Sequence, residues 1–148
     1  EEVTAVLRAL ARALRARGCG WQEVVFVHLY LASMADFAAA NAAYVAVVPL
    51  WEPPARACVQ APLEGSSRVL VDALVHPRGA QRRVMHVQSV SEWAPACIGP
   101  YAQAVAGFGG LCHIAGQIPL VPATMVLIEG GVETQARRAW TSARKVAA

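Results

Sequence analysis

The chain has 148 residues, a net charge of +3 and an apolar fraction of 56%. This length suits one ordinary domain with a real core. The longest apolar stretch, residues 37–51, is broken by Asn41 and Pro49 and is too short to span a bilayer, so we expect no membrane partner. Because a helix pattern starts at Glu1 without a secretory leader, we interpret the sequence as a cytoplasmic fragment of a longer protein.

The first part of the chain predicts two helices around a buried strand. Apolar residues at helical spacing from Val3 to Leu14, followed by Gly18, predict an amphipathic helix. β-Branched and aromatic residues over 24–31 predict a buried strand. Ser33 with Asp36 resembles a capping box and predicts a helix through about residue 48. Its inner face is predicted to carry Phe37, Tyr44 and Val48.

Prolines end this second helix and force extended backbone at Pro49, Pro53 and Pro54. Strands are predicted at 56–60 and 69–75, and the turn residues 64–67 between them predict a hairpin. The segment from Pro77 to Arg83 is the predicted linker.

The rest of the chain predicts four short strands and a final helix, at residues 84–88, 102–106, 111–115, 124–128 and 132–147. Positions 135, 140, 143 and 147 of that helix align at one constant offset with positions 2, 7, 10 and 14. A repeat at about one domain length is typical of tandem duplication. We therefore expect an α+β fold, with a mostly antiparallel sheet and helices packed on one face.

Metal, disulfide and nucleic-acid chemistry find little support. The cysteines form no Cys-x-x-Cys pair and the histidines no spaced ligand set, so we predict reduced thiols and no metal, with a disulfide framework as the alternative. No aromatic residues interleave with the arginines, which we interpret as solvated, so no nucleic-acid partner is expected. These arginines are Arg8, Arg12 and Arg15 in the first helix and Arg78, Arg82 and Arg83 in the linker.

Two motifs carry a family resemblance. Glu52-Pro53-Pro54-Ala55-Arg56-Ala57-Cys58-Val59 comes first, and Ile98-Gly99-Pro100-Tyr101-Ala102-Gln103 with Ala115-Gly116-Gln117-Ile118-Pro119-Leu120 comes second. They resemble signatures of the Rid family (YjgF/YER057c/UK114), in which the Gly-Pro-Tyr motif opens the domain and the Pro-Ala-Arg motif lies near its end. The inverted order implies the C-terminal part of one Rid-like domain, residues 1–76, a linker, 77–83, and the N-terminal part of a second, 84–148. The resemblance also implies a chorismate-mutase-like fold and trimers with pockets between units.

Arg56 is the first candidate ligand-binding residue. An extended Pro-Pro-Ala backbone can present its guanidinium to a carboxylate through two parallel hydrogen bonds, whereas a surface ion pair is the alternative. The resemblance implies that the matching arginine binds the carboxylate of an imino acid. A small carboxylate is therefore the expected ligand.

Four further residues complete the predicted ligand-binding set. The resemblance implies that Tyr101 lines the same pocket, with a core aromatic as the alternative. Gly116, beside Gln117, either lets a ligand approach the backbone or permits tight packing. Cys58 lines the pocket in the family pattern, although a strand cysteine is more often a small buried hydrophobe.

Two departures from the family argue against catalysis. Rid deaminases carry a glutamate that aligns with Leu70, and leucine cannot orient or deprotonate water. Asp72 shares that strand face, but strand geometry puts it roughly 7 Å further on. The family also often has a serine where Ala115 stands. We therefore predict no catalytic residue in this segment.

The phrase Ser91-Glu92-Trp93-Ala94-Pro95-Ala96 before Ile98-Gly99-Pro100-Tyr101 is similar to the second Rid-like domain of the diphthine–ammonia ligase family. That family uses ATP and ammonium to amidate diphthine on elongation factor 2. The ATP chemistry belongs to a nucleotide domain whose Ser-Gly-Gly-Lys-Asp-Ser loop is absent here, so no cofactor is expected in this segment. The resemblance implies an accessory role in homo-oligomer assembly, in presenting elongation factor 2, or in ligand binding. The alternatives are an imine/enamine deaminase and, less favoured, an L-PSP-type endoribonuclease.

Overall fold

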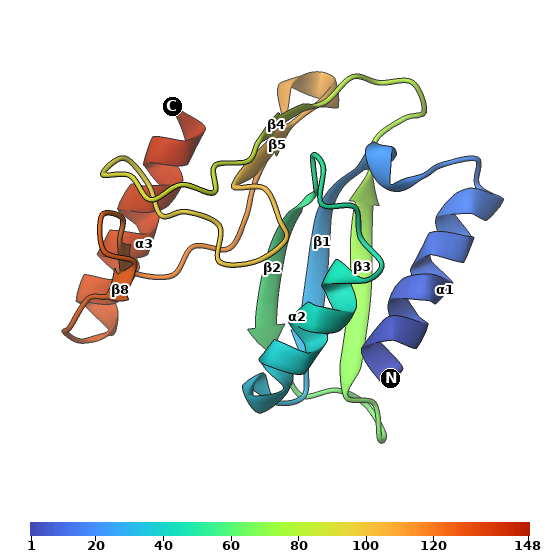
Figure 1. Ribbon diagram of the computed structural model, residues 1–148, viewed down its shortest axis with the longest axis horizontal. Coiled ribbons are helices and arrows are strands. Elements are labelled where there is room, and N and C mark those ends of the chain that lie inside the picture. Colours follow the sequence, from blue (N-terminus) through green and yellow to red (C-terminus); the bar gives the residue numbers. More distant parts are fainter.

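The computed structural model describes residues 1–148 and contains three α-helices and eight strands (Figure 1). The first part holds α1 (Glu2–Ala16), β1 (Val24–Leu31), α2 (Phe37–Val45), β2 (Ala55–Gln60) and β3 (Val69–Val75). The second part holds β4 (Arg83–Met85), β5 (Ala104–Ala106), β6 (Cys112–Ile114), β7 (Leu120–Val121), β8 (Val126–Leu127) and α3 (Val132–Ala147). Short 3₁₀ turns lie at η1 (Trp21–Glu23), η2 (Met34–Asp36) and η3 (Phe108–Gly110).

The first sheet has the order β2-β1-β3, with β1 parallel to β2 and antiparallel to β3. The predicted hairpin between β2 and β3 is therefore wrong. β1 is the most buried strand of the three and takes the central position, where both of its edges are paired. The crossover through α2 brings β2 back parallel to β1, as parallel neighbours require.

Both α1 and α2 cover one face of this sheet (Figure 1). Leu7 and Leu14 of α1 pack with Val24 and Val27 of the sheet, and with Tyr44 and Val48. The predicted inner face of α2 is thus confirmed for Tyr44. Val48 joins the same cluster from beyond the end of the helix, and Phe37 packs on an adjoining cluster.

The ends of α2 differ from the prediction. Ser33 accepts a hydrogen bond from the Ala35 amide at 3.2 Å, but this starts a 3₁₀ turn rather than the α-helix itself. At the other end, the amides of residues 47 and 48 both bond back to the Tyr44 carbonyl, so the chain leaves the helix before Pro49.

The second part is built from shorter elements. β4, β5 and β6 form an antiparallel sheet, and α3 packs on it through a small cluster that joins Val146 to Ala94 and Ala104. The strand predicted at 124–128 shrinks to β8, which pairs with β7. A turn with Met125 in the left-handed region, at φ 57°, joins them.

The two parts share a core on the face of the first sheet opposite α1 and α2. Ala55 of β2 forms a parallel bridge with Ala102, and the Gly116 amide donates to the Arg56 carbonyl at 3.0 Å. Buried residues from both parts meet there: Val25, Phe26, Ala55, Ala102, Val105 and Ala115. The two motifs therefore lie side by side.

One linker residue differs from its prediction. Arg82 was expected to be solvated, but it is partly buried and donates from Nη1 to the Val24 carbonyl at 2.8 Å and from Nη2 to the Glu52 carbonyl at 2.6 Å. These bonds tie the start of β4 to the first sheet.

The α+β prediction is confirmed, with one mixed and two antiparallel sheets. No helix combines the length and the apolar character needed to cross a membrane.

Candidate ligand-binding site

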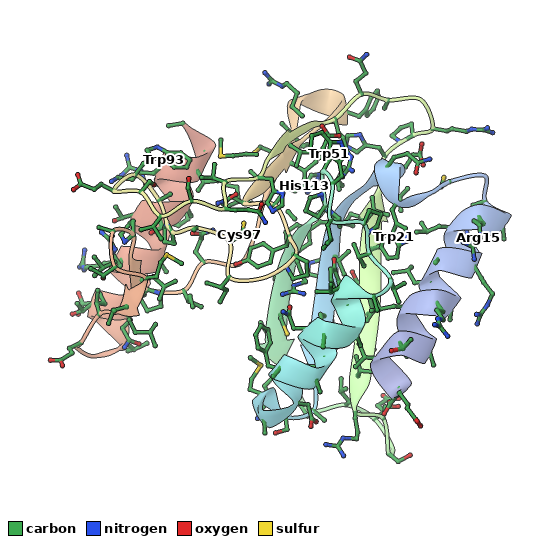
Figure 2. The ribbon with its side chains drawn as sticks, in the orientation of Figure 1. Arg15, Trp21, Trp51, Trp93, Cys97 and His113 are labelled. Atoms are coloured by element: carbon green, nitrogen blue, oxygen red, sulfur yellow. The ribbon has the colours of Figure 1, made fainter.

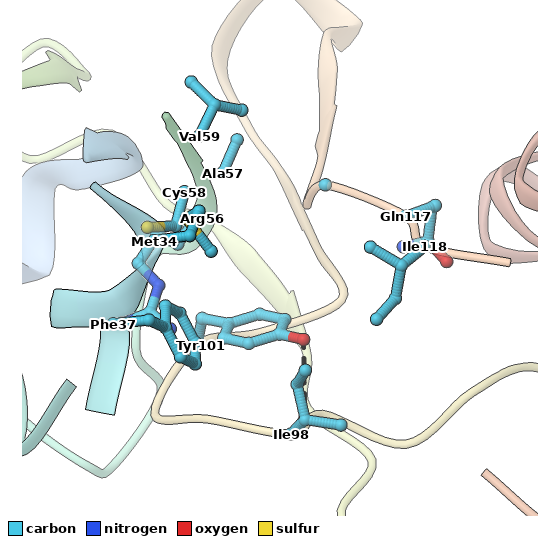
Figure 3. Close-up of a pocket in the computed structure, with 11 residues that line it drawn as sticks. Met34, Phe37, Arg56, Ala57, Cys58, Val59, Ile98, Tyr101, Gln117 and Ile118 are labelled. Carbon is cyan, nitrogen blue, oxygen red and sulfur yellow. Dashed lines mark hydrogen bonds between the residues drawn. The ribbon is translucent and has the colours of Figure 1, made fainter. Parts of the chain in front are cut away.

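A pocket of about 270 Å³ lies where β2 meets the Gly-Pro-Tyr segment and the chain leaving β6 (Figure 3). All five predicted ligand-binding residues line it: Arg56, Cys58, Tyr101, Gly116 and Gln117. The other lining residues are mostly apolar: Met34, Phe37, Ala57, Val59, Ile98 and Ile118. The wall is thus drawn from both parts of the chain.

Arg56 is held deep in the wall of this pocket. The buried Pro53 and Pro54 lead into β2, and Arg56 pairs with Val27 on the helix-covered side of the sheet. The residue is only 3% exposed. Its Nη2 donates to the Asn41 side-chain oxygen of α2 at 2.9 Å, while its Nη1 is buried without a partner.

Three aromatic rings surround this guanidinium. Its carbon lies 4.6 Å from the ring centre of Tyr44, 5.1 Å from that of Tyr101 and 6.0 Å from that of Phe37. Such cation–π contacts stabilise a cation without neutralising it. Burial lowers the pKa of Arg56, but arginine keeps its proton in proteins.

No acidic side chain lines the pocket or forms an ion pair with Arg56. A buried charge without a counter-ion is unfavourable unless something compensates it. The surface-ion-pair interpretation of Arg56 is therefore wrong, and the site is complementary to an anion.

The Gly-Pro-Tyr segment presses directly on the arginine. A Cβ added at Gly99 would lie 2.9 Å from Arg56 Nη2 and 3.1 Å from the Asn41 oxygen, so only glycine fits without displacement. Tyr101 accepts a long hydrogen bond, 3.4 Å, from the Ile98 amide. Burial, and then Cys97, raise the pKa of Tyr101, so its hydroxyl remains a donor at neutral pH.

The thiols near the site are poor nucleophiles. Burial raises the pKa of Cys58, and it raises the pKa of Cys97 to about 12, with the nearby Arg56 acting in the opposite direction in both cases. Both cysteines are therefore thiols rather than thiolates at neutral pH.

Gln117 lies across the pocket from Arg56 (Figure 3), and Gly116, which precedes it, also lines the pocket. A Cβ at Gly116 would make an ordinary 3.4 Å contact with Ala57, so packing alone does not demand glycine there. The side-chain Nε2 of Gln117 donates to the Ala115 carbonyl at 3.1 Å, which leaves the side-chain oxygen Oε1 free.

The contact of Asn41 with Arg56 was not predicted from the sequence, and Phe37 and Tyr44 were predicted only as core residues. The three positions follow one another at four-residue and three-residue intervals, so they share one face of α2. An amide on an otherwise apolar and alanine-rich helix face is the signal that could have found the arginine's partner.

Leu70 and Asp72 lie away from the pocket. Both project from the face of β3 opposite the helices, where Leu70 is 48% exposed and faces the β1 residue Tyr30. Asp72 instead accepts from His28 Nδ1 at 2.6 Å. Neither side chain supplies a base to this pocket.

Comparison with known proteins gives a consistent result. The family model described as endoribonuclease L-PSP matches residues 1–75 and 91–148. The chain is 37% identical over 126 residues to the diphthine–ammonia ligase of Schizosaccharomyces pombe, covering 85% of this chain and 20% of the ligase. It is 42% identical over 72 residues to the protein DfrA of Myxococcus xanthus, covering 48% of this chain and 52% of DfrA.

A solved structure supports the same relationship. A YjgF-family protein from Neisseria meningitidis superposes with a TM-score of 0.50 at 32% identity, over 53% of this chain and 68% of that one. The chain spans about a fifth of the ligase and about half of DfrA.

Proposed function

We propose that the pocket binds a small monocarboxylate through Arg56. The proposal starts from the finding that the chain belongs to the endoribonuclease L-PSP (Rid/YjgF) family. The observation that carries the proposal is the buried guanidinium, which has an unpartnered Nη1 and no acidic neighbour. A carboxylate supplies both the missing charge and the missing acceptor.

The shape and lining of the pocket narrow the ligand class. A volume of about 270 Å³ suits a molecule with few heavy atoms. The apolar side chains of Met34, Ile98 and Ile118 favour an apolar body. Because no carboxylate is present to receive an ammonium group, a zwitterionic amino acid should bind less well than the matching monocarboxylic acid.

Binding without hydrolysis fits the chemistry of the lining. No aspartate, glutamate or histidine lines the pocket, and burial keeps the nearby thiols and the Tyr101 hydroxyl protonated. A general base for activating water is thus missing from this wall. An imine deaminase is the second candidate, favoured by the retained Arg56 and Tyr101. An endoribonuclease is disfavoured because no histidine pair accompanies the pocket.

The similarity to the S. pombe ligase supports placing this segment in a diphthine–ammonia ligase. In that proposal, ATP-dependent amidation of diphthine on elongation factor 2 belongs to another part of the protein. Residues 1–76 and 84–148 would be parts of two Rid-like domains. The present pocket would act as an accessory ligand site.

The same proposal includes self-association through the first sheet, on the area of the face opposite α1 and α2 that the second part leaves exposed. Val59, Leu70 and Leu74 are 46%, 48% and 44% exposed on that face. Large apolar side chains exposed together on strands are typical of an interface. Oligomeric state measured by sedimentation, with Leu70→Asp as the disrupting variant, tests this part.

Calorimetric titration with butyrate and with its uncharged isostere butyramide tests the binding proposal. Butyrate should bind saturably and butyramide should not. Arg56→Gln should abolish butyrate binding, whereas Arg137→Gln, on the exposed side of α3, should leave it unchanged. Equal binding of butyrate and butyramide would overturn the proposal.

An assay for 2-iminopropionate hydrolysis separates the two leading candidates. We expect no turnover above the spontaneous rate. Robust turnover that Arg56→Gln removes would establish the deaminase instead.

A further inference from the structure

A buried histidine outside the pocket joins the two parts of the chain. His76 directly follows β3 and is 7% exposed. Its amide bonds to the Glu23 carbonyl at 2.8 Å, which fixes the backbone at the end of the sheet. Its ring reaches the second part, where Nε2 accepts a hydrogen bond from the Phe108 amide at 3.3 Å.

The tip of the β5–β6 hairpin is shaped to receive this ring. Gly107 lies against the imidazole so closely that a Cβ there would collide with Nε2 and the adjacent ring carbon. The Gly107 amide bonds to the Leu111 carbonyl at 2.9 Å and closes the tip. Gly109 and Gly110, at φ 73° and 74°, make the tight reversal that glycine permits.

The hydrogen bond from Phe108 requires a neutral imidazole. When Nε2 accepts, the ring proton is on Nδ1, which is buried without a partner. A second proton must go onto Nε2 and would turn the acceptor into a donor facing another donor. Protonation is therefore incompatible with the observed contact.

The surroundings of the ring oppose protonation in the same way. The charges of His113 in β6 and of Arg82 in the linker disfavour a proton on this ring, while Glu52 and Glu23 act in turn on Arg82. His113, labelled in Figure 2, lies against the first sheet, with its ring centre 6.4 Å from that of Phe26. Burial, followed by His113 and Arg82, lowers the pKa of His76.

We propose that His76 is an acid-released latch that fixes the β5–β6 tip to the end of β3 and thereby steadies one wall of the pocket. The coupling follows from the chain path. β6 continues directly into Ala115, Gly116 and Gln117, and β5 begins shortly after Tyr101. Releasing the tip frees one end of each of these two strands, and the other end of each leads to the pocket residues.

The direction of the pH effect follows from the lowered pKa. Above about pH 6.5, the ordinary value of histidine, both folded and unfolded states hold a neutral ring and the latch contributes its full stabilisation. As the pH falls below that value, the unfolded state takes up the proton first, so this stabilisation is progressively lost towards the folded-state pKa. Acid therefore opens the latch.

Amide hydrogen exchange of Phe108, followed by NMR and corrected for intrinsic rates, tests the latch. We expect its protection to fall by up to about tenfold per pH unit from about pH 6.5 down to the lowered pKa of His76 in the folded state, and the Gly116 amide signal to shift in parallel. His76→Gln offers an amide oxygen near the place of Nε2 that cannot titrate, so Phe108 protection should become independent of pH. His86→Gln is the matched control, because His86 is also a partly buried histidine with a lowered pKa, and it should keep the wild-type profile.

Unchanged Phe108 protection across the range, or a pH response that persists in His76→Gln, would overturn the proposal. A response at Phe108 without one at Gly116 would refute its link to the pocket. The ring tautomer of the unmodified protein gives a test that needs no variant. Nitrogen chemical shifts must show the neutral His76 protonated on Nδ1, and protonation on Nε2 would rule the latch out.

Discussion

The two long helices, α1 and α3, show how differently the two parts of the chain are held. α1 buries Leu7 completely and Leu14 to 5% exposure against a three-stranded sheet and α2. α3 is one residue longer, yet its buried positions are only Ser142 and Val146, and Trp140 remains 67% exposed. The partner of α3 is a sheet of three-residue strands.

This difference indicates that stability is concentrated in the first part. The second part is ordered by what it shares with the first: the Ala55–Ala102 bridge, the bond from Gly116 to the Arg56 carbonyl, and the His76 contact. The pocket lies on that shared boundary. A bound ligand should therefore stabilise the boundary between the two parts more than it stabilises the core of either part.

Leu7→Ala should cause the largest loss of stability among these substitutions. Removing a fully buried leucine from the α1 core should reduce the free energy of unfolding by about 2–5 kcal/mol. Trp140→Ala, at the aligned position of α3, should change it by no more than about 0.5 kcal/mol because most of that side chain is exposed. Denaturant unfolding measures both, and equal losses would contradict the contrast drawn between the helices.

The aligned pair also shows where sequence reasoning succeeds and where it stops. The helical pattern correctly predicts both helices, because amphipathic periodicity is local. It does not predict burial, because burial depends on the partner. The same offset places the exposed Trp140 on the buried Leu7. The pairing of β2 with β1 rather than with β3 could not be predicted either. A turn that joins two strands in sequence still allows a third strand to lie between them in the sheet.

The pocket shows the same division. Arg56 and Tyr101 stand in recognisable motifs, and extended backbone after prolines made a presented guanidinium a sound prediction. Asn41 was missed because its significance depends on α2 crossing near the start of β2, a tertiary contact. Leu70 was weighed as a member of the site, yet it lies on the opposite face of the sheet from Arg56.

Gly99→Ala should cause the second largest loss of stability. It tests the boundary between the two parts of the chain rather than the core of one part. The added methyl group would press on the Arg56 guanidinium and the Asn41 oxygen, and overpacking of this kind typically costs about 1–3 kcal/mol. Gly131→Ala is the matched control, because a Cβ there meets nothing within 4 Å. Thermal unfolding of the two variants should differ clearly; indistinguishable midpoints would show that the Gly-Pro-Tyr segment is free to move away from the arginine.

Asn41→Asp should change stability less than Leu7→Ala or Gly99→Ala, and it is the sharpest test of the unpaired charge. The substitution puts a carboxylate where an amide oxygen now lies 2.9 Å from Arg56 Nη2, so a hydrogen bond with one charged partner becomes an ion pair and gains Coulombic attraction. Desolvating the new carboxylate offsets part of that gain, so the net effect on unfolding should be within about 1 kcal/mol.

Butyrate affinity should nevertheless fall at least about tenfold in Asn41→Asp, because the internal carboxylate neutralises the cation that the ligand would otherwise meet. Asn41→Ala separates charge from geometry. It removes the hydrogen bond but adds no anion, so it should weaken butyrate binding less than the aspartate does. If the aspartate variant binds butyrate as tightly as the unmodified chain, the anion site cannot depend on the uncompensated charge of Arg56, and the aromatic rings and backbone donors of the boundary would have to provide the recognition instead.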